Sequence, residues 1–351
     1  MFAAGDCPGG GIKMIFEHAN YLVSIGNNVN IVYPAAINIL WDKSFVYRLD
    51  KWRIFLKRKY KIGYSANAWF PLDERVKEHW VYSLDYKNIP YSDIYIATEA
   101  RTAPYLKDYP IPIEKKFYFI QDYELWYFNK EQLENTYRYG FCNYTITKWL
   151  KTKVEVISEK ECPIVPNGFN LNDFYVTNPI KDRHKYFISM LYHTHERKDI
   201  PVALSALEIV KEIYPQIEVF VFGEAKDPHL PDWYHYYRKP DKETHLWLNN
   251  HAAIYVGSSK IEGFGLTVGE AMLCGQAVAC TDNLGYQEMA KDGVTALLSP
   301  CGDSKRLAEN IIKLIEDDQL RVTIANNSEV FIKENFSYKN TYERLLSVLG
   351  I

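Results

Sequence analysis

Two carboxylates with seven residues between them are the strongest chemical signal in the sequence. Glu262 and Glu270 enclose the glycine-rich segment Gly-Phe-Gly-Leu-Thr-Val-Gly, which follows an apolar run at 253–256 and opens a helix through Ala271. Ligands of open parallel sheets bind at the carboxyl ends of the strands, so both acids are expected near one sheet edge. Glu270 can then accept two hydrogen bonds from a ribose diol while Glu262 faces a sugar. Glu270 alone could instead favour the helix N-terminus, an effect of about 0.3–1 kcal/mol, but this leaves Glu262 unexplained.

The same edge offers groups that bind a diphosphate. Exposed N–H groups at a helix N-terminus attract anions. Arg197 and Lys198 follow the predicted strand 186–191 and precede another helix. They are either phosphate ligands or a solvated surface pair. Each charge-assisted hydrogen bond contributes roughly 1.5–3 kcal/mol. The expected donor-binding backbone of the loop comprises Gly263, Phe264, Gly265, Leu266 and Thr267. The backbone near Gly223 and the loop 228–238 would contact a base.

Other candidate residues lie in the first half of the chain. Gly10 and Gly11 belong to a glycine triplet between a short first strand and the first helix, where backbone amides approach a phosphate or sugar, or where the chain simply turns. The triplet does not match G-x-G-x-x-G, and a Walker lysine is missing. Asp122 and Glu124 follow a strand at 117–121 and either orient an acceptor hydroxyl or cap the next helix.

Alternating β-rich runs and amphipathic helical stretches must position these residues, and this alternation predicts two α/β domains with parallel sheets. The first helix has apolar residues at helical spacing from Ile12 to Val23, with Gly26 as its stop. Its sheet would start with a very short strand at 1–4, unless the start of the chain lies upstream of Met1. The predicted strands are 28–33, 94–97, 117–121, 144–147 and 163–165, then 186–191, 217–222, 253–256, 277–280 and 296–298.

The turn-rich segment 165–175 is the expected hinge between the domains. We therefore predict an acceptor domain at 1–168 and a donor domain at 169–337, with a cleft between them. A terminal helix at 338–351 would close back onto the first domain.

Composition limits the class of protein. With 351 residues, 47% of them hydrophobic and a net charge of -3, the chain is large enough for two cores and lacks the basic surplus typical of nucleic-acid binders. Its six cysteines form no C-x-x-C pair and indicate reduced thiols in a cytoplasmic protein. The segment 48–61 carries seven basic residues and one acid with Trp52, Phe55 and Leu56 at helical spacing. It is either a solvated face over a core stripe or a helix at an anionic membrane, peripheral to its inner face.

These motifs together resemble the retaining glycosyltransferases of family 4, which have the GT-B fold. The resemblance is to bacterial enzymes of surface-polysaccharide assembly, including rhamnosyltransferase-like members. It extends over most of the chain through the glycine-rich start, the segment 119–124, the linker 166–174 and the segment 262–279.

The resemblance implies transfer of a sugar from a nucleotide diphosphate sugar, with retention, to a saccharide or lipid-linked acceptor, without a metal or other cofactor. Glu270 would hold the ribose, Glu262 the donor sugar and Lys198 the diphosphate, while the first domain, with Gln121 and Asp122, would bind the acceptor or sugar. The chain departs from the family at His193, where a basic residue is usual, at Gln121, where many members have histidine, and at Leu284-Gly285, in place of a glycine pair. A sugar-nucleotide epimerase or a non-catalytic nucleotide-sugar-binding protein remains an alternative.

Overall fold

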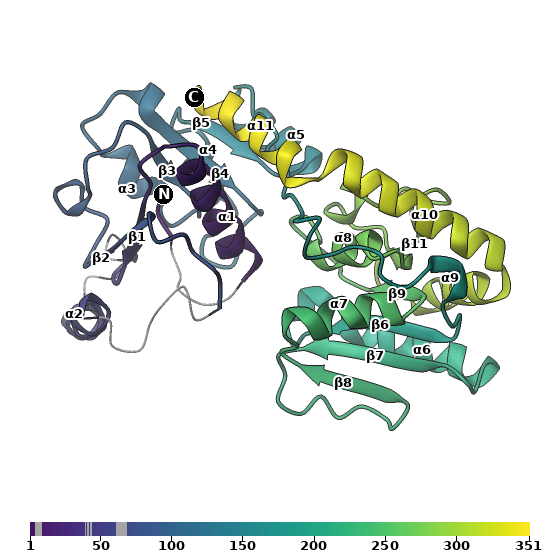
Figure 1. Cartoon of the computed structure of the whole chain (residues 1–351). Helices are drawn as coiled ribbons and strands as arrows, with labels where there is room; N and C mark the ends of the chain where they lie inside the picture. Colours follow the sequence, from purple (N-terminus) through teal and green to yellow (C-terminus); the bar gives the residue numbers. More distant parts are fainter. Residues whose placement is uncertain (4–8, 39, 41, 43, 61–68) are drawn as a thin grey trace. The chain divides into compact units, whose positions relative to one another are not determined.

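The chain divides into two compact units in a computed structural model, which describes residues 1–3, 9–38, 40, 42, 44–60 and 69–351. The first unit comprises Met1–Pro166 and Tyr342–Ile351, and the second comprises Asn167–Thr341. Part of the predicted first strand, one end of the basic segment and Cys7 lie outside the described residues. Figure 1 shows the elements of each unit.

The first unit is built around parallel strands. Its strands are β1 (Asn30–Pro34), β2 (Lys77–Val81), β3 (Tyr95–Ala97), β4 (Lys116–Ile120) and β5 (Cys142–Thr145). β1 pairs with β2, and the order of the others is β3-β4-β5. Phe2 connects the two groups because it bridges both Val32 of β1 and Ala97 of β3. Where the sequence predicts a short strand, the described chain start thus contributes a single bridge residue between the two groups.

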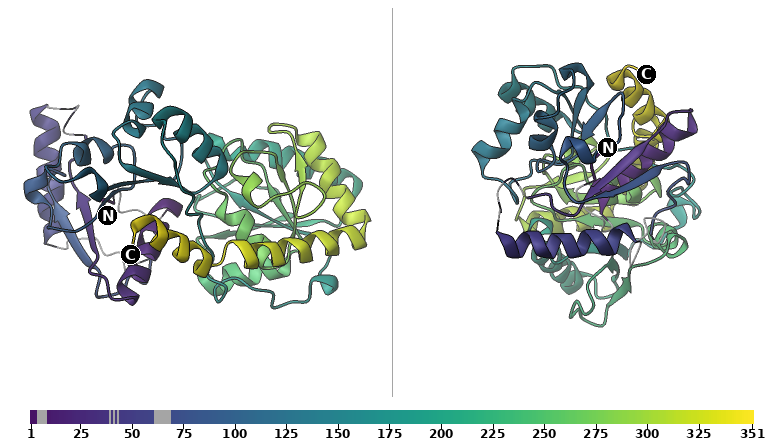
Figure 2. Two further views of the ribbon diagram at one scale, coloured as in Figure 1. Left: turned by 90° about the horizontal axis from the view of Figure 1, so that it is seen from above. Right: turned by 90° about the vertical axis from the view of Figure 1, so that its left-hand side faces the viewer.

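Helices surround this sheet. They are α1 (Gly10–Ser24), α2 (Phe45–Lys59), α3 (Ala103–Lys107), α4 (Lys130–Tyr137), α5 (Lys148–Ser158) and the end of α11 (Tyr338–Leu349). α1 ends at Ser24, and Gly26 follows as the predicted stop: it has a φ of +96° and its N–H bonds to the Val23 carbonyl. α1 and α11 lie side by side (Figures 1 and 2), and the rings of Tyr21 and Tyr342 stack with centroids 3.9 Å apart.

The second unit contains a parallel sheet of six strands in the order β11-β10-β9-β6-β7-β8. The strands are β6 (Phe187–Tyr192), β7 (Glu218–Gly223), β8 (Tyr234–Arg238), β9 (Ile254–Gly257), β10 (Ala277–Thr281) and β11 (Leu297–Ser299). The helices are α6 (Ile200–Ile213), α7 (Lys242–His251), α8 (Leu266–Leu273), α9 (Ser304–Glu316), α10 (Asp318–Asn335) and the start of α11. The strand order reverses next to β6 and β9, so the loops that follow these strands meet at a topological switch point, where ligands of such sheets bind.

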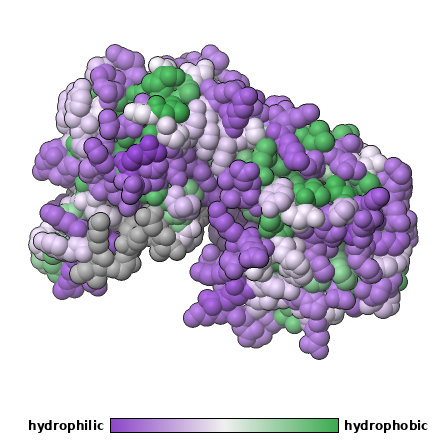
Figure 3. Space-filling model, in the orientation of Figure 1, coloured by the Kyte–Doolittle hydropathy of each residue, from purple (hydrophilic) through white to green (hydrophobic). Residues whose placement is uncertain are grey.

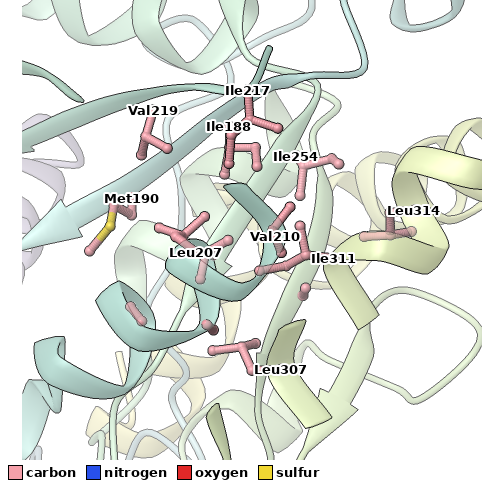
Figure 4. Close-up of a cluster of buried hydrophobic side chains, with 14 of the residues drawn as sticks. Ile188, Met190, Leu207, Val210, Ile217, Val219, Ile254, Leu307, Ile311 and Leu314 are labelled. Carbon is pink, nitrogen blue, oxygen red and sulfur yellow. The ribbon is translucent and has the colours of Figure 1, made fainter. Parts of the chain in front are cut away.

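The core of the second unit lies between the sheet and the helices α6 and α9. Figure 4 shows Leu207 and Val210 of α6 facing Ile188 and Ile254 of the sheet and Ile311 of α9, all almost fully buried. Strand residues alternate between the two faces of a sheet. The neighbour of Ile254, Tyr255, therefore points to the opposite face, where its hydroxyl bonds with Thr267 of α8. Helices thus cover both faces, as the predicted α/β class requires.

Two strands were not predicted from the sequence. β2, Lys-Glu-His-Trp-Val, is too charged to read as a strand, and its burial rises only toward Val81. β8, Tyr-His-Tyr-Tyr-Arg, falls in the segment 228–238, which we expected to be a loop. Both are edge strands, where only one neighbour pairs and polar side chains are tolerated. The predicted strand at 163–165 reduces to a single bridge between Ile164 and Thr145.

One face of the molecule illustrates the distribution of polar and apolar residues. On the face shown in Figure 3, hydrophilic residues predominate and hydrophobic ones form scattered patches. Among the residues that the structure describes, no helix combines the length and apolar character needed to cross a bilayer.

The core of the second unit yields a stability prediction. Replacing Leu207 by Ala removes methyl groups from a fully buried position and is expected to lower the free energy of unfolding by about 2–5 kcal/mol. Ile213→Ala on the same helix is the matched control, because Ile213 is 54% exposed. Chemical denaturation monitored by circular dichroism measures both. Equal effects of the two substitutions would contradict this packing.

Candidate active site

Lys198 and Glu262 form an ion pair beside the carboxyl ends of β6 and β9. Lys198 Nζ lies 2.6 Å from Glu262 Oε1, and the two side chains are 24% and 13% exposed. Lys198 ends a short 3-10 helix, Glu196–Lys198, that follows β6, and Glu262 lies in the loop between β9 and α8. Residues 64 positions apart thus place opposite charges together where a ligand could reach both.

Two serines that the sequence analysis did not single out hold this pair. Ser258 Oγ donates to the backbone carbonyl of Lys198 at 2.9 Å, and Ser259 Oγ donates to Glu262 Oε1 at 2.6 Å. The hydroxyl of Tyr286 donates in turn to Ser259 Oγ at 3.1 Å. Burial raises the pKa of Tyr286 and the charge of Glu262 raises it further, so this hydroxyl keeps its proton and remains a donor. The sequence feature that could have indicated Ser258 and Ser259 is their position as two polar residues directly after the buried strand β9.

Asn283 fixes the next loop against the same serine. Its Nδ2 donates to the Ser259 carbonyl at 3.0 Å, and its Oδ1 accepts from the N–H groups of Gly285 and Tyr286 at 3.1 and 3.0 Å. A Cβ atom on Gly285 would lie 2.4 Å from the Glu262 carbonyl oxygen. Close packing of the two loops therefore requires glycine at the second position of the segment Leu284-Gly285.

The glycine-rich segment turns sharply into α8. Gly265 is the N-cap with a φ of +97°, and a Cβ there would lie 2.5 Å from the Tyr286 ring. Leu266 and Thr267 begin the helix, so their backbone N–H groups lie in its first turn, the part of a helix that attracts anions. The Phe264 side chain is 3% exposed and packs against Phe169 and Phe336. Only the backbone of Phe264, and that of the half-buried Gly263, is thus placed for a ligand.

The negative charges of Glu262 and Glu270 both affect the pKa of one buried tyrosine, Tyr255. Burial raises the pKa of Tyr255, and the charges of Glu262 and Glu270 raise it further. Glu270 itself is 7% exposed and lies in the middle of α8, not at its end. The favourable contribution of a carboxylate to a helix N-terminus is confined to the first turn, so that alternative explains little of this acid.

Two histidines follow β6 next to Lys198. His193 Nδ1 accepts the His195 N–H at 2.9 Å, and His195 Nδ1 accepts the Arg197 N–H at 3.2 Å. Partial burial lowers the pKa of His193, and the positive charge of Lys198 lowers it further. His193 is therefore neutral near pH 7 and supplies no cation. The Arg197 carbonyl accepts the Lys260 N–H at 2.8 Å, and its side chain is half-buried.

Gly223 ends β7 at the same edge of the sheet. A Cβ there would lie 2.2 Å from the Tyr192 carbonyl oxygen and 3.3 Å from the Tyr236 hydroxyl. Packing between the ends of β6, β7 and β8 is thus enough to require glycine at this position.

The candidates of the first unit lie at the start of a helix and after a strand. Gly10 and Gly11 form the first turn of α1, not the loop before it that we expected, because Gly9 is the N-cap. A Cβ on Gly11 would lie 3.4 Å from the Gln121 side chain, which follows β4. Asp122 Oδ1 accepts the Tyr123 N–H at 2.7 Å.

Neither Asp122 nor Glu124 caps the next helix. Asn129 does so for α4, through a capping box with Gln132. Glu124 is instead buried, and its carboxylate accepts the Ala100 N–H at 2.7 Å. Burial raises the pKa of this carboxyl well above its usual range, and the neighbouring charge of Glu99 raises it further.

Over the described part of the chain, no three His, Cys, Asp or Glu side chains gather as a metal site would require. The five described cysteines, Cys142, Cys162, Cys274, Cys280 and Cys301, are all free thiols.

Comparison with known proteins identifies the class of the second unit. Residues 176–331 match the model of the family described as Glycosyl transferases group 1. This segment is similar to that family over somewhat less than half of the chain, and it contains the Lys198–Glu262 pair, the serines and α8.

Relatives of known sequence agree with this class. The uncharacterized glycosyltransferase MJ1069 of Methanocaldococcus jannaschii is 26% identical over 216 residues, which cover 54% of this chain and 55% of that protein. A phosphatidyl-myo-inositol mannosyltransferase of Mycolicibacterium smegmatis is 25% identical over 169 residues, covering 45% and 44%. The chain spans about half the length of these curated relatives.

Solved structures show the fold of the whole chain. The structure of Anabaena Alr3699/HepE in complex with UDP-glucose has a TM-score of 0.72 at 16% identity, covering 99% of this chain and 98% of that one. Sucrose-phosphate synthase from Thermosynechococcus elongatus has a TM-score of 0.68 at 16% identity, covering 99% and 96%. The predicted GT-B fold of two Rossmann-like domains is confirmed.

The effect of the Lys198 charge on the pKa of His193 can be measured. Lys198→Met removes a nearby positive charge and leaves the negative charge of Glu262, which raises the pKa of His193. The pKa of His193 is therefore expected to rise toward or above the ordinary histidine value of about 6.5. A histidine NMR titration measures it, with Lys305→Met on the exposed start of α9 as the control. A His193 pKa that stays the same or falls would contradict the arrangement.

Proposed function

We propose that this protein is a glycosyltransferase that moves a sugar from a nucleotide diphosphate sugar to a hydroxyl group of a saccharide or lipid-linked acceptor. The observation that carries the proposal is the Lys198–Glu262 pair at 2.6 Å, beside the start of α8 in the segment that is similar to group 1 glycosyltransferases. A cation, a carboxylate and helix N–H groups at one sheet edge are what a sugar diphosphate requires.

Lys198 would bind the diphosphate together with the N–H groups of Gly265, Leu266 and Thr267. Transfer breaks the bond between the anomeric carbon and the β-phosphate oxygen, and the acceptor oxygen forms the new bond to that carbon while its hydroxyl proton is lost. Negative charge then develops on the departing phosphate, and preorganised donors stabilise such charge most strongly. Because Lys198 supplies positive charge at this place, we propose that transfer needs no metal ion. Arg197 would add a second cation.

Glu262 would contact the donor sugar, and Glu270 would accept hydrogen bonds from the ribose hydroxyls. Ser259 supports this division, because its hydroxyl fixes Glu262 Oε1 at 2.6 Å and leaves Oε2 for a ligand. The charges of Glu262 and Glu270 both raise the pKa of Tyr255, so the two acids lie near one side chain, which supports contacts to one ligand. The backbone at Gly223 and the half-exposed β8 would then adjoin the base.

The first unit would bind the acceptor. Gln121 and Asp122 follow β4, and the first turn of α1 at Gly10 and Gly11 reaches the Gln121 side chain. Within the described residues Gln121 Oε1 is buried and has no hydrogen-bond partner. A buried amide oxygen of this kind is normally satisfied, so a ligand hydroxyl that donates to it is the natural partner.

Retention of configuration, rhamnosyltransferase-like specificity and a role in cell-surface polysaccharide or glycan synthesis complete the proposal. The named relatives support this setting. One is the capsular polysaccharide biosynthesis glycosyltransferase CapM of Staphylococcus aureus, 33% identical over 99 residues, which cover 28% of this chain and 26% of that protein. A lipid-linked acceptor would place a cytoplasmic enzyme at the inner face of a membrane, and α2 supplies the candidate contact.

A donor screen followed by product analysis tests the activity. UDP-, GDP- and dTDP-sugars are compared for thermal stabilisation, and a donor at 100 times its Kd is expected to stabilise the folded state by about 2.7 kcal/mol. With the stabilising donor, a transferase consumes sugar only when an acceptor is present. Sugar isomerisation without acceptor would indicate an epimerase, and binding without turnover over a range of saccharide and lipid-linked acceptors would indicate a sensor. Full activity in the presence of EDTA is expected.

Glu262→Gln separates catalysis from donor binding. The substitution keeps the shape of the side chain and removes its charge, so kcat is expected to fall about 100- to 1,000-fold, the usual effect of losing one electrostatic contact to a transition state. Donor affinity should change much less. Glu288→Gln, after β10 and outside the proposed contacts, is the control. A Glu262→Gln enzyme with unchanged kcat would remove this residue from the mechanism.

A further inference from the structure

The helix α2 exposes a stripe of large apolar side chains. Phe45, Leu49 and Trp52 are spaced at i, i+4 and i+7, and they are 78%, 42% and 52% exposed. Residues at this spacing share one face of a helix. No residue of α2 is buried, so the alternative in which Trp52 belongs to a core stripe is wrong. We call Phe45, Leu49 and Trp52 the α2 stripe.

A side of α2 next to the stripe is held against β2 and the residue that follows it. The Phe55 ring lies 6.4 Å from the Tyr82 ring, and the Arg58 guanidinium lies 5.3 Å from the Trp80 ring. Tyr82 also donates from its hydroxyl to the Arg48 carbonyl at 3.4 Å. These contacts fix the rotation of the helix about its axis, so the stripe faces outward because of packing and not because the helix is loose.

Positive charge is concentrated on the same helix. α2 carries six basic residues and one acid, a net charge of +5, whereas the whole chain has a net charge of -3. At about 100° per residue, Arg48 and Lys59 lie on one flank of the stripe, and Arg53 and Lys57 lie on the other. Lys59 Nζ lies over the Phe55 ring at 5.6 Å, so Arg53 and Lys57, which take no part in the contacts described above, are the cations chosen for substitution.

We propose that α2 lies flat on an anionic lipid bilayer, with the α2 stripe inserted among the headgroups and the flanking cations paired with lipid phosphates. The helix has 15 residues and is therefore about 22 Å long, too short to cross a hydrocarbon core of about 30 Å. Aromatic and leucine side chains on one face with lysine and arginine beside them are typical of interfacial helices. This surface is independent of the transfer reaction and would hold the enzyme where lipid-linked acceptors are.

The symmetry of the charges favours a membrane over a protein partner. A bilayer presents negative headgroups on both sides of an inserted stripe, which suits cations on both flanks. A protein partner would need an apolar groove with acidic residues along both rims. Such a partner, or a second copy of this chain, is a distinct outcome of the test.

Vesicle flotation with the whole 351-residue chain tests the proposal. The protein is expected to float with vesicles of 30% phosphatidylglycerol in phosphatidylcholine, much less with pure phosphatidylcholine, and less as salt screens the charges. Replacing Phe45, Leu49 and Trp52 together by Ser should reduce binding at least tenfold. Arg53→Gln and Lys57→Gln should each reduce it about fivefold, which corresponds to the about 1 kcal/mol that a basic residue contributes near such a surface.

The matched control replaces exposed apolar residues on other helices by Ser. Val156, Ile213 and Val330 are 76%, 54% and 48% exposed and lie on α5, α6 and α10. This control should float like the wild type, and melting temperatures establish that both triple variants fold.

Failure of the wild type to bind the anionic vesicles would overturn the proposal, as would equal flotation of the stripe variant. A wild-type oligomer that the stripe variant dissociates, without vesicle binding, would assign the stripe to a protein contact. Donor stabilisation measured on the same variants keeps a failure here separate from a failure of the proposed activity.

Discussion

The candidate site depends on two adjacent hydroxyl groups at the end of one buried strand. Ser258 holds the backbone of Lys198, and Ser259 holds the carboxylate of Glu262. Their own position is fixed because the Ser259 carbonyl accepts from both Thr281 and Asn283 of the neighbouring strand and loop. Two oppositely charged side chains that meet at a sheet edge lose conformational freedom. The serine hydrogen bonds already restrict this freedom in the ligand-free protein. In the proposed enzyme this preorganisation would place the cation and the carboxylate on the two sides of the sugar–phosphate bond.

The ion pair also implies that Glu262 and a bound diphosphate would compete for Lys198. In the ligand-free protein the positive charge of the partly buried Lys198 is balanced by the carboxylate of Glu262 at 2.6 Å. An incoming diphosphate must therefore compete with Glu262 for this lysine. A diphosphate carries more charge and meets the N–H groups of α8 as well, which favours the ligand. Glu262 would then be released from Lys198 while Ser259 still holds it beside the sugar. The carboxylate therefore opposes diphosphate binding even though it assists transfer.

Much of this arrangement could be predicted from the sequence, and the remainder shows where sequence patterns carry little information. The periodicity from Ile12 to Val23 located α1, and the apolar runs located most strands, because burial on a sheet demands such residues. β2 and β8 escaped notice because edge strands tolerate charged and aromatic residues. The spacing of Glu262 and Glu270 and the position of Lys198 marked the candidate loops, whereas Ser258, Ser259 and Asn283 act through single hydrogen bonds that leave no spacing pattern. The burial of Phe264 and the exposure of Trp52 depend on tertiary packing, which periodicity alone does not determine.

The most direct measurement is the Kd of the nucleoside diphosphate belonging to the stabilising donor, determined by calorimetry for the wild type, Lys198→Met and Glu262→Gln. If Lys198 binds the diphosphate and Glu262 competes for it, Lys198→Met weakens binding by about tenfold or more, as expected for a charge-assisted hydrogen bond of roughly 1.5–3 kcal/mol, and Glu262→Gln strengthens it. An unchanged Kd in Lys198→Met, or weaker binding in Glu262→Gln, would contradict the account.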